Sequence, residues 1–218
     1  MNRIDRRRLA ATPAERQAAQ TRKRAILIAA IVVPALLILV AIVLFNNRAV
    51  QSASVSTIQS TVKVGQPAPN FAVSTTKGLF DLRRAGDKPT LLEVFATWCP
   101  HCQRETQTLD ALHAKYGPRV NIVAVSGAPD NIDRTAPESQ ADVIAFANQF
   151  KVTYPIAFDP NLDVAHKYLQ DGYPTLVLID KGSVASIGSG EIPFAALSNV
   201  LDAALTGKKP DPKMGQKG

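Results

Sequence analysis

The sequence predicts an α/β domain preceded by one transmembrane helix. Apolar, β-prone runs alternate with segments of helical period between residues 62 and 206, which indicates a sheet packed against helices. A run of 21 residues without charge, 25–45, follows a basic arm. The two cysteines of the chain, Cys99 and Cys102, lie where a predicted strand gives way to a predicted helix.

The basic arm, residues 1–24, carries eight basic and two acidic side chains, and so most of the net charge of +7. The rest of the chain is close to neutral. A nucleic-acid-binding domain would carry its basic residues on a face of the folded part. The charge distribution therefore disfavours a nucleic-acid partner.

The apolar run, residues 25–45, has the length of a membrane span. As a helix it would extend about 31 Å, close to the hydrocarbon thickness of a bilayer, and Pro34 is tolerated in such helices. A buried core helix rarely stays apolar all round. A cleaved secretory signal has an apolar core of about 7–15 residues and a small-x-small cleavage site. We therefore expect an uncleaved signal anchor.

The positive-inside rule predicts the topology of a single-pass protein of the cell membrane. The arm is expected in the cytoplasm and everything after residue 45 on the other side, where conditions usually permit disulfide chemistry. Residues 46–61 are small and polar and predict a flexible linker. Residues 62–206 are the predicted folded domain, and the polar segment 207–218 is expected to be a disordered tail.

Each element of the domain is predicted from its own pattern. Continuous apolar runs are typical of buried strands in a parallel sheet. Leu109, Leu112 and Tyr116 recur at helical spacing, and Gly117 and Pro118 end that helix. The predicted order is a strand around residue 71, a hairpin or turn at 77–89, a strand at 89–96, a helix at 103–116, a strand at 120–127, a loop at 128–140, a helix at 141–150, a strand at 154–159, a helix at 162–170, strands at 175–180 and 183–190, and a helix at 193–205.

Three kinds of site can use Cys99 and Cys102. A closed zinc site needs four Cys or His ligands, and the three histidines are not spaced as a partner pair. A structural disulfide across four residues contributes only about 2 kcal/mol in the chain-entropy view. A redox couple fits the position at the start of a helix. We therefore expect catalytic cysteines, with no metal and no cofactor.

Cys99 is the predicted nucleophile, because free N–H groups and the helix dipole stabilise a thiolate at a helix N-terminus. Pro100 supplies the fixed φ of a first helical turn. Cys102, one turn further, is expected to resolve the mixed disulfide. His101 is expected to add a donor or positive charge beside the sulfur, which stabilises the reduced form and makes the disulfide more oxidising.

The segment Phe95–Glu105, FATWCPHCQRE, resembles the active site of thioredoxin-fold proteins. The layout of residues 64–205 is similar to that of the membrane-anchored TlpA/ResA-like thiol-disulfide oxidoreductases. This resemblance implies a thioredoxin-like fold, with a central mixed sheet flanked by helices. Trp98 stands where that family carries a tryptophan before the first cysteine, and Glu105 where it has an acidic residue after the second.

The resemblance also implies roles for residues outside the cysteine pair. Tyr173, Pro174 and Thr175 occupy the place of the family's cis-proline loop, which faces the disulfide and pairs with substrate backbone. Glu93 stands at a strand position that often holds a buried acid, and the apolar residues around it predict burial. A buried carboxyl has a raised pKa and can exchange a proton with Cys102. The predicted substrate-binding residues are Trp98, Pro100, Tyr173 and Thr175.

The Pro-His dipeptide between the cysteines is similar to that of the strongly oxidising DsbA-type enzymes, whereas the body resembles TlpA/ResA-like members. A peroxiredoxin mechanism is disfavoured, because the Pro-x-x-x-Thr-x-x-Cys arrangement is missing. The sequence therefore predicts a membrane-anchored, extracytoplasmic enzyme that exchanges disulfides with client proteins, with oxidation as the favoured direction. An unidentified membrane redox partner would reset the couple. Two alternatives are a thiol reductase for cytochrome c maturation and a non-catalytic redox-sensing domain.

Overall fold

The computed structural model describes residues 60 and 62–215. The predicted basic arm, membrane span and most of the predicted linker lie outside these residues. Within the described part of the chain, no helix has the length and apolarity needed to cross a bilayer.

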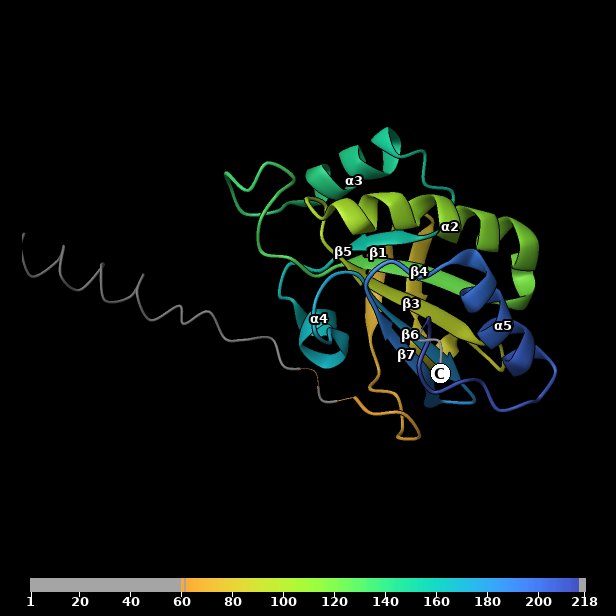
Figure 1. Cartoon of the computed structure of the whole chain (residues 1–218). Coiled ribbons are helices and arrows are strands. Elements are labelled where there is room, and N and C mark those ends of the chain that lie inside the picture. The colour runs from red at the N-terminus through yellow and green to blue at the C-terminus, as the bar shows by residue number, and fades with distance from the viewer. Residues whose placement is uncertain (1–59, 61, 216–218) are drawn as a thin grey trace, which may run out of the picture. The chain divides into compact units, whose positions relative to one another are not determined.

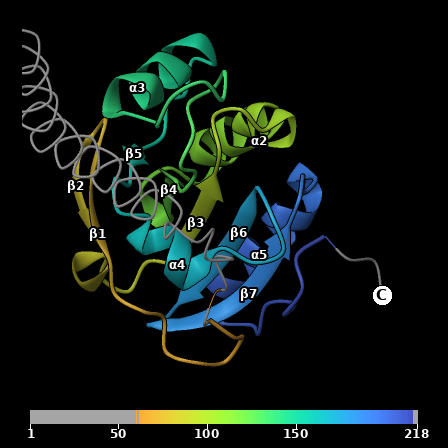
Figure 2. The same cartoon turned by 90° about the vertical axis from the view of Figure 1, so that its left-hand side faces the viewer.

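The domain is built on a seven-stranded mixed sheet (Figure 2). The spatial order is β2-β1-β5-β4-β3-β6-β7, with β3, β4 and β5 parallel and the remaining pairs antiparallel. The strands are β1 (Ala72–Thr75), β2 (Gly78–Asp81), β3 (Thr90–Phe95), β4 (Asn121–Ser126), β5 (Ile156–Phe158), β6 (Thr175–Asp180) and β7 (Ser183–Ser189). This arrangement confirms the expected central mixed sheet.

Helices cover both faces of the sheet (Figure 1). The helices are α2 (Pro100–Tyr116), α3 (Gln140–Gln149), α4 (Asp163–Tyr168) and α5 (Phe194–Leu205), with 3-10 turns at Leu82–Arg84 and Gly117–Arg119. α2, α3 and α5 pack on one face, and α4 packs on the other. The helix that the sequence placed at 103–116 begins three residues earlier, because the predicted limits left out the proline-led first turn.

β3 is the central strand, and all six of its residues are buried. Because strand side chains alternate between faces, Leu91 and Phe95 contribute to the core beneath α2, while Leu92 and Val94 contribute to the core beneath α4. Glu93 shares the α2 side with Leu91 and Phe95. The strand thus carries a carboxyl group into an apolar layer.

The C-terminal segment differs from the expectation of a disordered tail. Ile187 of β7 donates its N–H to Pro212 O at 3.1 Å and accepts from Met214 N at 3.0 Å. The Met214 side chain is buried, with 3% of its surface exposed. Composition suggested a segment with nothing to bury, but the free edge of β7 supplies backbone partners and Met214 supplies an apolar side chain. The structure describes this segment as far as Gly215.

Gly127, directly after β4, allows α4 to approach the sheet closely. A Cβ at this position would lie 2.7 Å from Ala165 Cβ and 2.8 Å from Val94 Cγ1. We therefore expect Gly127→Ala to lower the free energy of unfolding by about 1–3 kcal/mol, as overpacking of a core does. Urea unfolding measures this. Ser74→Thr, which adds a methyl group at an exposed position of β1, should change it by less than about 0.5 kcal/mol, and equal losses in both variants would contradict the argument.

Candidate active site

Cys99 caps the N-terminus of α2, as the sequence predicts. Its backbone is extended, and its carbonyl accepts from Gln103 N at 3.0 Å while Pro100 occupies the first helical turn. β3 ends four residues earlier, so the end of a buried strand fixes where the helix starts. Free N–H groups at this end of the helix favour an anionic sulfur.

Both cysteines are present as free thiols and both are buried. Cys99 exposes 5% of its surface and Cys102 exposes 1%. Burial raises the pKa of the Cys102 thiol far above its usual range, and the nearby Glu93 raises this pKa further. Only Cys99 therefore has an edge open to a partner, and Cys102 is the deeper, neutral thiol expected of a resolving cysteine.

The cis-proline loop lies against the first cysteine. The peptide bond between Tyr173 and Pro174 is cis, and the Cys99 thiol donates to Tyr173 O at an Sγ-to-oxygen distance of 3.5 Å. The Trp98 and Tyr173 rings pack edge to face, with centroids 5.7 Å apart. The structure thus brings together Trp98, Cys99, Tyr173 and Pro174 from opposite halves of the domain.

Thr175 occupies a different position from that expected of a substrate-binding residue. It is fully buried, and its hydroxyl donates to Gly172 O and accepts from Gln170 N. These contacts close the loop on itself before β6 begins. The side chain holds the cis-proline loop in place, and the outer surface of the loop is formed by the residues before it.

Glu93 lies under the cysteine pair with 2% of its surface exposed, as the sequence predicts. Its Oε1 has no hydrogen-bond partner among the described residues. Burial raises the pKa of this carboxyl well above its usual range, and the Glu105 and Cys99 charges raise it further. A carboxyl group with a raised pKa is suited to exchange a proton with the deeper thiol.

Glu105, which the sequence marks only through the resemblance, is a second buried acid. It lies on α2 one turn after Cys102 and is fully buried. Its Oε2 accepts from Ile192 N at 3.0 Å. Burial raises the pKa of Glu105 to about 7, although the Ile192 hydrogen bond acts in the opposite direction. The cysteine pair is thus bordered by two carboxyl groups.

His101 takes part in a surface cluster. Its Nδ1 lies 3.3 Å from Glu191 Oε2 and 2.8 Å from Arg104 Nη2, and Arg104 Nε donates to the same Glu191 oxygen at 2.9 Å. Among the described residues, no hydrogen bond joins this imidazole to a cysteine sulfur. Arg104 first, and then His101, lower the pKa of Glu191. The contacts of the His101 imidazole are therefore with Glu191 and Arg104, and not with the sulfur beside which the sequence predicted a donor or positive charge.

Sequence reasoning missed the residues that support the active-site loop. The Glu138 carboxylate accepts from Thr97 Oγ1 at 2.7 Å and from Ser126 Oγ, and all three residues are buried. Arg134 lies over the Trp98 ring, 4.3 Å from its centroid. No local pattern signals these contacts, because the partners come from a loop some forty residues along the chain.

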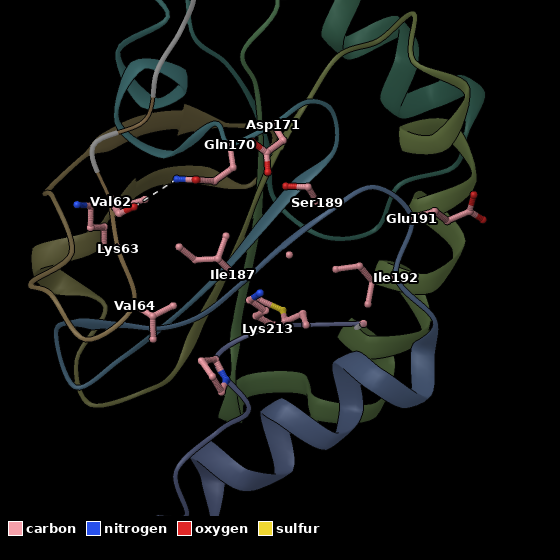
Figure 3. Close-up of a pocket in the computed structure, with 14 residues that line it drawn as sticks. Val62, Lys63, Val64, Gln170, Asp171, Ile187, Ser189, Glu191, Ile192 and Lys213 are labelled. Carbon is pink, nitrogen blue, oxygen red and sulfur yellow. Dashed lines mark hydrogen bonds between the residues drawn. The ribbon is translucent and has the colours of Figure 1, made fainter. Parts of the chain in front are cut away.

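A pocket of about 470 Å³ lies beside the site (Figure 3). It is lined by the segment 62–64, the end of β7 with the residues after it, and the segment 212–215. Glu191 and Ile192 line it as well, and these two residues contact His101 and Glu105 through the bonds described above. The predicted cysteine, tryptophan and cis-proline residues do not line it. The pocket therefore adjoins the redox centre but does not include its cysteines.

Comparison with known proteins adds to this geometry. The family model described as AhpC/TSA matches residues 64–187. The chain is 31% identical over 143 residues to the thioredoxin-like protein YneN of Bacillus subtilis, covering 65% of this chain and 80% of that protein. It is also 31% identical to the thiol-disulfide oxidoreductase ResA of Geobacillus thermodenitrificans, covering 69% of this chain and 83% of that protein.

The fold has matching solved structures. A thiol:disulfide interchange protein described as DsbE, from Chlorobium tepidum, superposes with a TM-score of 0.58 at 28% identity, covering 66% of this chain and 99% of that chain. This likeness confirms a thioredoxin-like α/β fold. With a Cys-x-x-Cys pair at the start of α2, the chain belongs to the AhpC/TSA family and is a thiol-disulfide oxidoreductase of the ResA/DsbE type.

Proposed function

We propose that this enzyme is a membrane-anchored, extracytoplasmic reductase of disulfides in client proteins. The observation that carries the direction is the charge around the cysteines. Two buried carboxyl groups, Glu93 and Glu105, lie on the same side of the sheet as the pair, and His101 contacts Glu191. Burial, and then Glu93, raise the pKa of Cys102 and so disfavour a second thiolate, which makes the reduced form of the pair less stable. A couple whose reduced form is less stable gives up its electrons more readily.

This direction replaces the oxidising one that the Pro-His dipeptide suggested. The dipeptide argument needed a positive imidazole beside the sulfur, and the contacts of His101 are with Glu191 and Arg104 instead. The ResA-named relatives fit a reductase better than an oxidant. The anchoring rests on the apolar run at residues 25–45 and on the positive-inside rule.

The reaction uses the two thiols in sequence. The Cys99 thiolate attacks one sulfur of a client disulfide, forming a mixed disulfide and releasing the first client thiolate. Cys102 then loses its proton to Glu93 and attacks Cys99 Sγ, which forms the intramolecular disulfide and releases the second client thiolate. The client gains two electrons, and a membrane redox partner returns two electrons to the enzyme.

Client binding is proposed at the aromatic surface next to Cys99. Trp98 and Tyr173 form a rigid edge-to-face pair, and rigid aromatic side chains provide contact area at low entropic cost. The backbone of the cis-proline loop lies within reach of the Cys99 sulfur. An extended client segment that pairs with this loop would present its disulfide to Cys99.

The first prediction separates catalysis from sensing. Cys99→Ser should abolish turnover of a disulfide-bonded client by the purified domain with dithiothreitol as reductant, because the attacking sulfur is lost. Cys102→Ser should accumulate mixed disulfides, because the second sulfur cannot release the client. Non-reducing gel electrophoresis detects these adducts. Turnover of Cys99→Ser at the wild-type rate would show that the pair does not perform the chemistry.

The second prediction concerns the midpoint potential of the couple, measured against glutathione. We expect a value close to the roughly −270 mV of thioredoxin, and far from the roughly −120 mV of DsbA. His101→Ala should shift it by less than about 30 mV, which corresponds to about 1.4 kcal/mol, because the imidazole is paired with Glu191. A potential near that of DsbA would overturn the proposed direction.

The third prediction follows from the raised pKa of Glu105, which burial brings to about 7. A carboxyl with a raised folded-state pKa contributes stability at low pH that is lost as the pH rises from about 4.5 to about 7. Glu105→Gln should remove this loss, which amounts to ~3 kcal/mol at most.

Urea unfolding at pH 5 and pH 8 measures the effect. The wild-type protein should lose more stability between these values than Glu105→Gln does. Asp87→Asn, which removes an exposed carboxylate, is the control and should follow the wild type. Parallel losses in all three proteins would contradict the assignment.

A further inference from the structure

Four buried polar atoms near the cysteines have no hydrogen-bond partner among the described residues. They are Glu93 Oε1, Glu105 Oε1, the hydroxyl of Tyr154 and Trp98 Nε1. Tyr154 is completely buried and does not take part in the two thiol steps. Buried polar groups in folded proteins are almost always satisfied, by one another or by internal water. Several such atoms beside one redox centre therefore indicate a shared function.

The fold places the Tyr154 side chain on the same face of the sheet as Glu93. Ala124 of β4 pairs with Glu93 on one side and with Ile156 on the other, and Tyr154 shares a face with Ile156 because it lies two residues earlier. Both residues belong to the core beneath α2. Ala124, whose side chain is a single methyl group, lies between Glu93 and Ile156 on this face of the sheet.

The backbone around Tyr154 is fixed to the active-site helix. Asp110 of α2 accepts from the backbone N–H of Thr153 at 2.8 Å and from its hydroxyl at 2.7 Å. On the other side, Pro155 accepts from Ala124 N at 3.0 Å. The backbone on either side of Tyr154 is thus held to α2 and to β4.

The charges around this hydroxyl are those of the redox site. Burial raises the pKa of Tyr154 well above its usual range, and Glu93 contributes more than any other charged group. Apolar side chains of α3 and α5 belong to the same core as Tyr154. The titratable groups that face the cluster are Glu93 from β3, Cys99, Cys102, Glu105 and Asp110 from α2, and Tyr173 from the cis-proline loop.

We propose that Tyr154 is a positioning residue for proton transfer in the exchange reaction. Its hydroxyl, joined to the Glu93 carboxyl through an internal water, donates toward that carboxyl and favours the ionised form that accepts a proton from Cys102. The donor capacity of a phenol suits this role, because it remains neutral at any pH at which the enzyme works. The inference rests on thiol-disulfide exchange and is independent of its direction in the cell.

The Cys102 thiol passes its proton to the Glu93 carboxylate, and the Cys102 sulfur attacks Cys99 Sγ of the mixed disulfide. A sulfur–sulfur bond forms between the two cysteines, and the bond between Cys99 and the client breaks. The departing client sulfur keeps the electron pair and takes a proton from water. In the reverse direction, Glu93 returns the proton to Cys102.

The test compares Tyr154→Phe with the wild type in the full chain. Reduced enzyme is mixed with oxidised glutathione between pH 5 and pH 9, and formation of the enzyme disulfide is followed by the fluorescence of Trp98, the single tryptophan of the chain. We expect the acid limb of the rate profile to move up by about one pH unit in the variant, because the carboxylate loses a donor. That shift corresponds to about tenfold slower resolution at pH 6. Alkylation of Cys99 by iodoacetamide should be unchanged.

Tyr116→Phe is the matched control. It removes a buried hydroxyl from the same core, one that donates to Ser198 O and Asp202 Oδ1 at the far end of α2, and it should leave the profile unchanged. In a Glu93→Gln background, Tyr154→Phe should have no further effect. A Tyr154→Phe profile that superposes on the wild type, an equal shift in Tyr116→Phe, or an additive effect in the Glu93→Gln background would each overturn the proposal. A midpoint potential near that of DsbA would overturn only the proposed direction.

Discussion

The active site depends on one junction, the point at which β3 ends and α2 begins. β3 is buried on both faces and paired on both sides, so its end cannot shift without disturbing the whole sheet. The helix that follows starts at Pro100, and the first cysteine therefore stands at the helix N-terminus. The same rigid strand brings Glu93 beneath the pair. A mobile loop could supply a nucleophile, but it could not hold a buried acid in register with it.

Features that depend on residues close together in the chain could be predicted from the sequence. The strand before the cysteines, the helix that starts at them and the buried Glu93 all follow from local apolar pattern, and the cis bond at Pro174 follows from family resemblance. Contacts between distant segments could not be predicted. Glu191 pairs with His101, which lies 90 positions away in the sequence, and no local sequence pattern predicts this contact. The same limit hid Glu138, whose carboxylate binds hydroxyls from two separate strand ends.

The family and the chemistry carry different information. The AhpC/TSA model matches the body of the domain, yet the peroxiredoxin arrangement of proline, threonine and cysteine is missing from the sequence. A fold supports many activities, and the activity is decided by the site. Here the site has two thiols one helical turn apart, with carboxyl groups beneath them. Only the Cys99 sulfur has an edge open to a partner, so Cys99 performs the attack. The more deeply buried Cys102 performs the resolution.

The pairing along β7 has a consequence for the behaviour of the protein in solution. The outer edge of this strand is occupied at one end by Gly65 and Gln66, which bond to Val184, and further along by Pro212 and Met214. An uncovered strand edge is a template for intermolecular sheet extension and aggregation. Both ends of the domain therefore act as covers for that edge. Trimming the C-terminal residues would leave the N–H and C=O of Ile187 unpaired at this edge, and self-association would follow from a change that touches no catalytic group.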